Sequence, residues 1–151
     1  MSKADDLRSQ LIRSFATPDA SWSTFKREPH YESEGVRLAR GTAAKKLGMS
    51  VDIVPPGKRA CPYHFHYAEE EAFIVLEGSG TLQTGGRIDN IKETDLTSLG
   101  AGISHTGTHA GGVTQRVVPG DVFVVPAGMA HRFSQLDGPI RYVVYRFEPG
   151  K

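Results

Sequence analysis

Residues 64–73, which read HFHYAEEEAF, decide how this sequence is interpreted. Side chains two apart on a β-strand project to the same face, so His64 and His66 can converge on one point. Three consecutive acids follow, and a carboxylate on the next strand can supply a further ligand to a metal ion held by two histidines. Strand parity puts Glu70 and Glu71 on opposite faces and does not choose between them.

The composition is that of an ordinary globular domain. The chain has 151 residues, 38% hydrophobic and 23% charged, with a formal net charge of +1. This length suits one domain, and the charge balance gives no basis for binding nucleic acid or an anionic membrane. No apolar run approaches the roughly 20 residues that span a bilayer, and the first residues lack a signal-peptide core. The single cysteine fits a reducing compartment, so we expect a cytoplasmic protein.

The distribution of glycine and proline indicates an all-β fold. The 17 glycines and nine prolines separate short β-branched runs, as in domains built from many strands and tight turns. A paired hairpin is expected around the turn at 119–121. The expected strands are 36–40, 49–53, 72–76, 81–84, 117–118, 122–125 and 140–147.

Two segments fall outside this pattern. Residues 5–15 carry apolar residues at helical spacing, which predicts a short N-terminal helix. We therefore divide the chain into a helix and extended arm at 1–35 and a barrel at 36–151. The segment 87–115 is polar and glycine-rich without a clear period, too long for a plain connection, and is interpreted as either disorder or a functional loop.

Two separated motifs resemble those of the cupin superfamily. The first is His64-x-His66, four residues, Glu71, six residues and a glycine; the second runs from Gly120 to His131 through a proline and a glycine. The departures are a turn one residue longer before His64 and Gln135 in place of the usual asparagine.

The resemblance implies a double-stranded β-helix, the cupin jelly roll. It also implies that His64, His66, Glu71 and His131 bind one divalent transition metal (Fe, Mn, Ni, Co or Zn), and it selects Glu71 over its neighbours. Gln135 would then lie behind the ligands. Four protein ligands on an octahedral ion leave two positions for a small-molecule substrate or ligand.

The resemblance leaves the reaction open, because cupins include several enzyme classes and non-catalytic binders. We expect metal-dependent action on a small oxygenated molecule, with an oxidoreductase, namely a dioxygenase, ahead of the alternatives. These are an isomerase or epimerase of a sugar or small acid, and a non-catalytic metal-dependent binding or sensor protein. The resemblance also suggests a homodimer, with 140–147 and the N-terminal helix as interface elements.

Further residues are assigned more loosely. His105 and His109 are candidate catalytic residues if 87–115 closes over the barrel as a lid, and exposed loop histidines otherwise. Glu69 and Glu70 are expected in a solvated turn. Three aromatic residues are candidates either for the wall of a pocket or for the core: Phe73, Phe133 and Tyr142.

Overall fold

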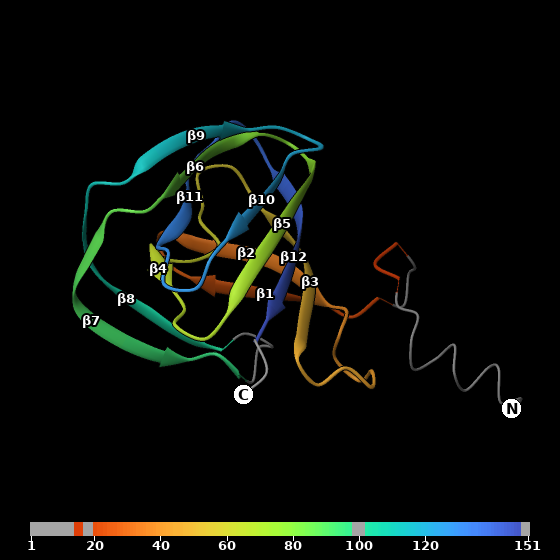
Figure 1. Cartoon of the computed structure of the whole chain (residues 1–151). Helices are drawn as coiled ribbons and strands as arrows, with labels where there is room; N and C mark the ends of the chain where they lie inside the picture. The colour runs from red at the N-terminus through yellow and green to blue at the C-terminus, as the bar shows by residue number, and fades with distance from the viewer. Residues whose placement is uncertain (1–13, 17–19, 98–101, 149–151) are drawn as a thin grey trace, which may run out of the picture.

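The structure, a computed structural model, describes residues 14–16, 20–97 and 102–148, and these form two antiparallel sheets that face each other (Figure 1). The strands are β1 (Trp22–Arg27), β2 (Tyr31–Arg37), β3 (Leu47–Val54), β4 (His64–Phe65), β5 (Glu70–Glu77), β6 (Gly80–Thr84), β7 (Arg87–Asp95), β8 (Ile103–Ala110), β9 (Val113–Val117), β10 (Val122–Val125), β11 (His131–Leu136) and β12 (Ile140–Phe147). The first sheet has the order β1-β2-β3-β12-β5-β10, and the second has the order β7-β8-β4-β11-β6-β9.

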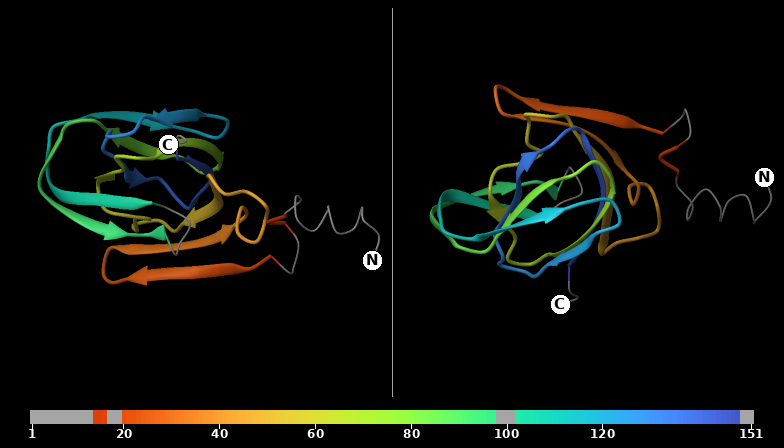
Figure 2. Two further views of the ribbon diagram at one scale, coloured as in Figure 1. Left: turned by 60° about the horizontal axis from the view of Figure 1, so that its bottom comes forward. Right: turned by 90° about the horizontal axis from the view of Figure 1, so that it is seen from above.

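The all-β prediction is confirmed. Most of the predicted helix at 5–15 lies outside the described residues, and the part within them, 14–15, is not helical. Among the described residues, none belongs to a helix long and apolar enough to cross a membrane. The domain division at 35/36 stays a prediction, although β1 and β2 form a hairpin that pairs with β3 and extends the first sheet (Figure 2).

The core lies between the two sheets and follows the alternation of side chains along each strand. Along β5, Phe73 and Val75 point inward and are buried, and the buried residues Ile140 and Val144 of β12 pack with them. Glu71 is on the same inward face of β5 and is 3% exposed. A charged side chain therefore lies on the face that otherwise forms the apolar core.

The segment 87–115 is mostly strand, so its interpretation as an irregular or disordered loop is wrong. With β6 it forms a long hairpin, in which β7 pairs with β8 and β6 pairs with β9. The hairpin bends where two glycine pairs meet, Gly85-Gly86 and Gly111-Gly112, all with positive φ. Backbone pairing across two long, polar strands explains why no hydrophobic period marked them.

Two further expectations fail for reasons of topology. The strands around the turn at 119–121 do not pair, because β9 joins the second sheet and β10 the first. The segment 140–147 is not a sheet edge, because β12 lies between β3 and β5 and pairs with both. It therefore offers no free strand for pairing with a second subunit, and the homodimer itself stays a prediction.

The bend of the long hairpin should depend on Gly86. An alanine at this position would adopt a φ of 74° and place its Cβ 2.6 Å from Ala110 O. Gly57 has nearly the same φ, 75°, but nothing lies within 4 Å of an added Cβ. Both substitutions incur the left-handed backbone penalty of about 1–2 kcal/mol. Gly86→Ala should lower the free energy of unfolding in urea clearly more than Gly57→Ala, and equal losses would contradict this account of the bend.

Candidate metal centre

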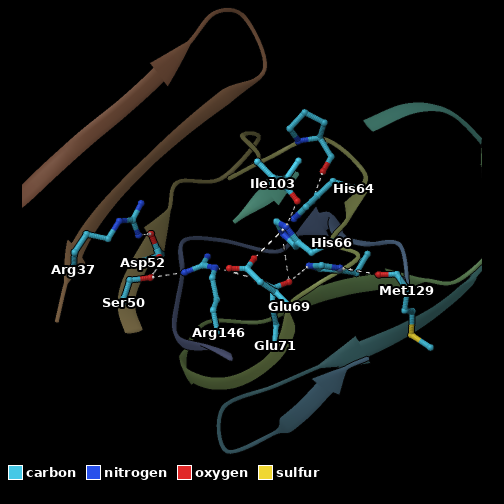
Figure 3. Close-up of polar contacts among 12 residues, drawn as sticks. Arg37, Ser50, Asp52, His64, His66, Glu69, Glu71, Ile103, Met129 and Arg146 are labelled. Carbon is cyan, nitrogen blue, oxygen red and sulfur yellow. Dashed lines mark hydrogen bonds and ion pairs between the residues drawn. The ribbon is translucent and has the colours of Figure 1, made fainter. Parts of the chain in front are cut away.

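Three histidines from the second sheet face one carboxylate from the first (Figure 3). His64 on β4 pairs in register with His131, the first residue of β11, and their ring centroids lie 4.4 Å apart. His66 follows β4 directly. Possible ligand atoms of His64, His66 and Glu71 all lie within 4.8 Å of one another. The Nε2 atom of His131 lies 2.9 Å from Oε2 of Glu71. The structure thus brings together the four residues named as ligands from the sequence.

The backbone fixes the orientation of all three imidazoles. Nδ1 of His64 lies 2.9 Å from Pro62 O, that of His66 lies 2.8 Å from Ile103 O, and that of His131 lies 3.2 Å from Met129 O. A carbonyl oxygen only accepts, so each Nδ1 carries the donated proton. Burial lowers the pKa of His64 and lowers that of His66 to about 4. In the neutral rings, the Nε2 lone pairs are therefore free to bind a cation.

Glu71 is held in its ionised form. Burial by itself raises the pKa of this carboxyl, but contact with His131 and the charge of Arg146 outweigh burial and keep the pKa well below its ordinary value. Arg146 Nε donates to Oε1 of Glu71 at 3.0 Å. No described residue makes a hydrogen bond to Oε2, which is buried and faces the histidines. A buried carboxylate oxygen opposite nitrogen lone pairs lacks a partner that a cation would supply, so this donor set fits a divalent metal ion.

A chain of polar contacts supports the carboxylate from behind (Figure 3). Arg146 pairs with Glu71 across β12 and β5, and its Nη1 atom lies 3.4 Å from Ser50 Oγ. Ser50 donates to Asp52 Oδ2 at 2.6 Å, and Asp52 accepts from Arg37 at 3.2 Å. Because Arg146 occupies Oε1, this chain directs Oε2 alone toward the histidines.

The four residues line a cavity of about 770 Å³ between the sheets. Phe73, Phe133 and Tyr142 line it as well, which confirms their interpretation as pocket walls. Burial raises the pKa of Tyr142 well above its ordinary value, so its hydroxyl remains a hydrogen-bond donor at neutral pH. A cavity of this size holds a small organic molecule beside the ligand cluster.

Glu69 is a site residue that the sequence interpretation missed. It was expected in a solvated turn, but it is 6% exposed, lines the cavity, and places Oε2 3.1 Å from Nδ1 of His66. Gly102, directly before β8, donates its N–H to the Glu69 carboxyl, and a Cβ there would lie 2.9 Å from Glu69 Cδ. Glu69 is buried at the cavity wall only because the distant segment that contains Gly102 packs against it. Glu70 is exposed, as expected.

The histidines of the long hairpin lie elsewhere. His105 pairs in register with Phe65 and stacks on its ring, on the face of β4 opposite to His64. Its Nε2 atom contacts Glu93. His109 is exposed and packs against Tyr63. Neither ring lines the cavity with the ligand cluster, although His105 lines a smaller cavity beside Glu69. A catalytic role for these two histidines stays a prediction that the geometry of the main cavity does not support.

Gln135 also fails as a supporting residue. It is exposed, it pairs with Thr81 next to an irregularity in β11, and it does not line the cavity. The groups behind the ligands are instead backbone carbonyls and Arg146. The irregularity between Phe133 and Gln135 shifts the register of β11, which strand parity does not anticipate.

Comparison with known proteins agrees with this architecture. The sequence profile of the cupin domain matches residues 50–112, which contain three of the four candidate ligands. Residues 50–112 thus match the cupin domain, and the two-sheet fold is shared with solved cupin structures. No curated protein sequence matches it.

Three solved structures illustrate the breadth of this superfamily. A protein named as a sugar phosphate isomerase from Acidithiobacillus ferrooxidans is 20% identical, with a TM-score of 0.65 over 94% of this chain and 77% of the other. A predicted oxalate decarboxylase from Thermotoga maritima is 16% identical, with a TM-score of 0.59 over 87% and 95%. A polyketide cyclase from Streptomyces resistomycificus is 20% identical, with a TM-score of 0.57 over 93% and 83%. At these identities the likeness concerns the cupin fold.

The buried histidines should make stability depend on pH. The pKa of His66 falls from 6.5 in the unfolded chain to about 4 in the folded protein, mainly through burial. Between these values the unfolded chain binds more protons, so stability is complete above pH 6.5 and falls as pH drops toward 4. For the metal-free protein, His66 alone should account for about 3 kcal/mol of this loss.

Urea unfolding of chelator-treated protein between pH 7 and 4.5 measures this effect. His66→Asn should flatten the pH dependence, whereas His30→Asn, at an exposed position, should leave it unchanged. The same pH dependence in all three proteins would refute the assignment of a buried neutral imidazole.

Proposed function

We propose that this cupin binds one divalent first-row transition metal through His64, His66, Glu71 and His131 and converts a small oxygenated molecule in the adjoining cavity. The observation that carries the proposal is the convergence of three tied imidazoles on a buried carboxylate oxygen that has no hydrogen-bond donor. When bound, such an ion supplies Lewis acidity toward hydroxyl or carbonyl oxygens of a ligand. Nitrogen and carboxylate ligands suit Fe, Mn, Ni, Co and Zn.

The chain's own residues orient the site and offer groups for proton transfer. Arg146 keeps Glu71 ionised and aimed at the histidines. Glu69, buried beside the cluster, is a carboxylate positioned at the cavity wall, and Tyr142 offers a hydroxyl donor on another wall. The aromatic walls limit the access of water to a bound ligand.

These groups favour isomerisation of a hydroxy-carbonyl compound as the first candidate. Such a reaction moves a proton between adjacent carbons, and it needs an acid–base residue near the polarised oxygens. Glu69 is a candidate for this residue because it is buried and lines the same cavity as the cluster, and the likeness to a protein named as a sugar phosphate isomerase supports the same choice. This reverses the order expected from the sequence, in which oxidation came first, because the buried position of Glu69 was then unknown.

Oxidation by O₂ remains the second candidate. The proposed ligand set accommodates iron and leaves positions for a substrate atom and O₂. A non-catalytic binder would use the same cavity and show no turnover. Iron content with substrate-dependent O₂ uptake would favour the oxygenase, whereas manganese or zinc content without O₂ uptake would favour isomerisation or binding.

Metal content tests the ligand assignment. Protein purified without chelators should contain close to one equivalent of a first-row transition metal by elemental analysis. Glu71→Gln and His131→Ala should weaken metal binding by more than the roughly 10–100-fold loss that accompanies a missing supporting hydrogen bond. His109→Ala, a histidine outside the cavity, should keep the full metal content. Unchanged metal content in both ligand variants would eliminate the site.

The role of Glu69 has a separate test. Glu69→Gln should retain the metal but lose most of the turnover of a hydroxy-carbonyl substrate. The variant should also lose most of the incorporation of solvent deuterium into that substrate. The exposed neighbour provides a matched control, because Glu70→Gln changes the same charge without reaching the cavity. If Glu69→Gln retains full isomerisation and deuterium incorporation, another group moves the proton.

A further inference from the structure

The open end of the main cavity carries cations without partners. Arg40, Lys45 and Lys46 lie in the connection between β2 and β3, line the cavity and are exposed. None of the three forms an ion pair with any residue that the structure describes. Of the other arginines that line the cavity, Arg37 pairs with Asp52 and Arg146 with Glu71, whereas Arg27 lies over the Tyr31 ring.

Some cations elsewhere on the surface form ion pairs. Lys26 pairs with Glu28, Arg87 with Asp89 and Arg116 with Asp137. Arg27, Arg59, Lys92 and Arg132 also lack an ion pair with a described residue, but only the connection between β2 and β3 gathers three such cations within seven residues. The acid Glu148, whose N–H donates to Lys46 O, lines the main cavity and also the smaller cavity beside Glu69, and it forms no ion pair with the three cations.

The sheet register gives the spacing between these cations and the ligand cluster. Gly48, Arg146 and Glu71 lie in register across β3, β12 and β5. Two strand spacings separate the backbones of Gly48 and Glu71, which is about 10 Å. Lys46 directly precedes β3, at the end of the barrel where β12 ends (Figure 1). The backbone next to Lys46 thus stands about the length of a short carbon chain away from the cluster, and Arg40, Lys45 and Lys46 line the same cavity as the cluster.

We propose that Arg40, Lys45 and Lys46 form a subsite for the terminal phosphate of an oxygenated carbon chain whose other end reaches the ligand cluster. A phosphate monoester carries close to two negative charges at neutral pH and suits a cluster of point-charge donors. Cations at the entrance of a cavity also raise the local concentration of anionic ligands. A two-carbon dicarboxylate is too short to span both places. The inference rests on the proposed function for the far end of the ligand only.

Calorimetric titration with ribose 5-phosphate and with ribose tests the subsite. The phosphate ester should bind the wild-type protein more tightly than the free sugar, by a factor of about ten or more. This is the scale expected from three exposed charge contacts. The preference for the phosphate ester should shrink at high salt. The variant R40A/K45A/K46A should lose this preference. The variant K26A/R87A/R116A changes net charge by the same amount outside the cavity and should keep it. Circular dichroism establishes that both variants are folded.

Metal content, measured on the same samples, separates this inference from the proposed function. Equal binding of the two sugars, absence of ribose 5-phosphate binding, or a preference that survives in R40A/K45A/K46A would overturn the subsite, whatever the metal content. A phosphate preference that is lost only in R40A/K45A/K46A supports the subsite, whether or not the protein contains metal. If the protein contains no metal, the proposed function alone fails.

Discussion

The burial of the Glu71 carboxylate opposite three imidazole lone pairs is the constraint on which the rest of the site depends. A charged oxygen without a donor is unfavourable in an apolar interior, and the two sheets bring this one against the nitrogen atoms of three histidines. Arg146 compensates one oxygen from the neighbouring strand, and the backbone carbonyls hold each ring with its Nδ1 proton directed away. The remaining atoms form a set of acceptors that is complete only with a cation.

The long hairpin contributes to this site without supplying a ligand. Its bend at the glycine pairs lets β8 pair with the short ligand-bearing strand β4, while the residues before β8 reach the cavity wall. There, the carbonyl of Ile103 orients His66, and Gly102 leaves room for the buried carboxyl of Glu69. The segment is thus a structural wall of the site. Its backbone matters more than its histidines, which face the opposite side of the sheet.

The cavity separates three kinds of surface. The ligand cluster and Glu69 form a polar region, Phe73 and Phe133 form an apolar wall, and unpaired cations stand where the cavity opens to solvent. Such a division suits a ligand that is oxygenated at one end and anionic at the other.

The sequence alone determined the all-β class, through the two-residue period of strands and the turn glycines and prolines. The resemblance of two motifs to those of cupins named the four residues of the cluster and selected Glu71 over Glu70, a choice that strand parity left open. Only the tertiary structure decided the roles of Glu69, Arg146, His105 and Gln135, and the pairing of β9 and β10 with different sheets. Each of these depends on contacts between distant segments, on a glycine that admits a carboxyl, or on an irregularity that shifts register. No local period records such contacts, because they arise only when two sheets close over one another.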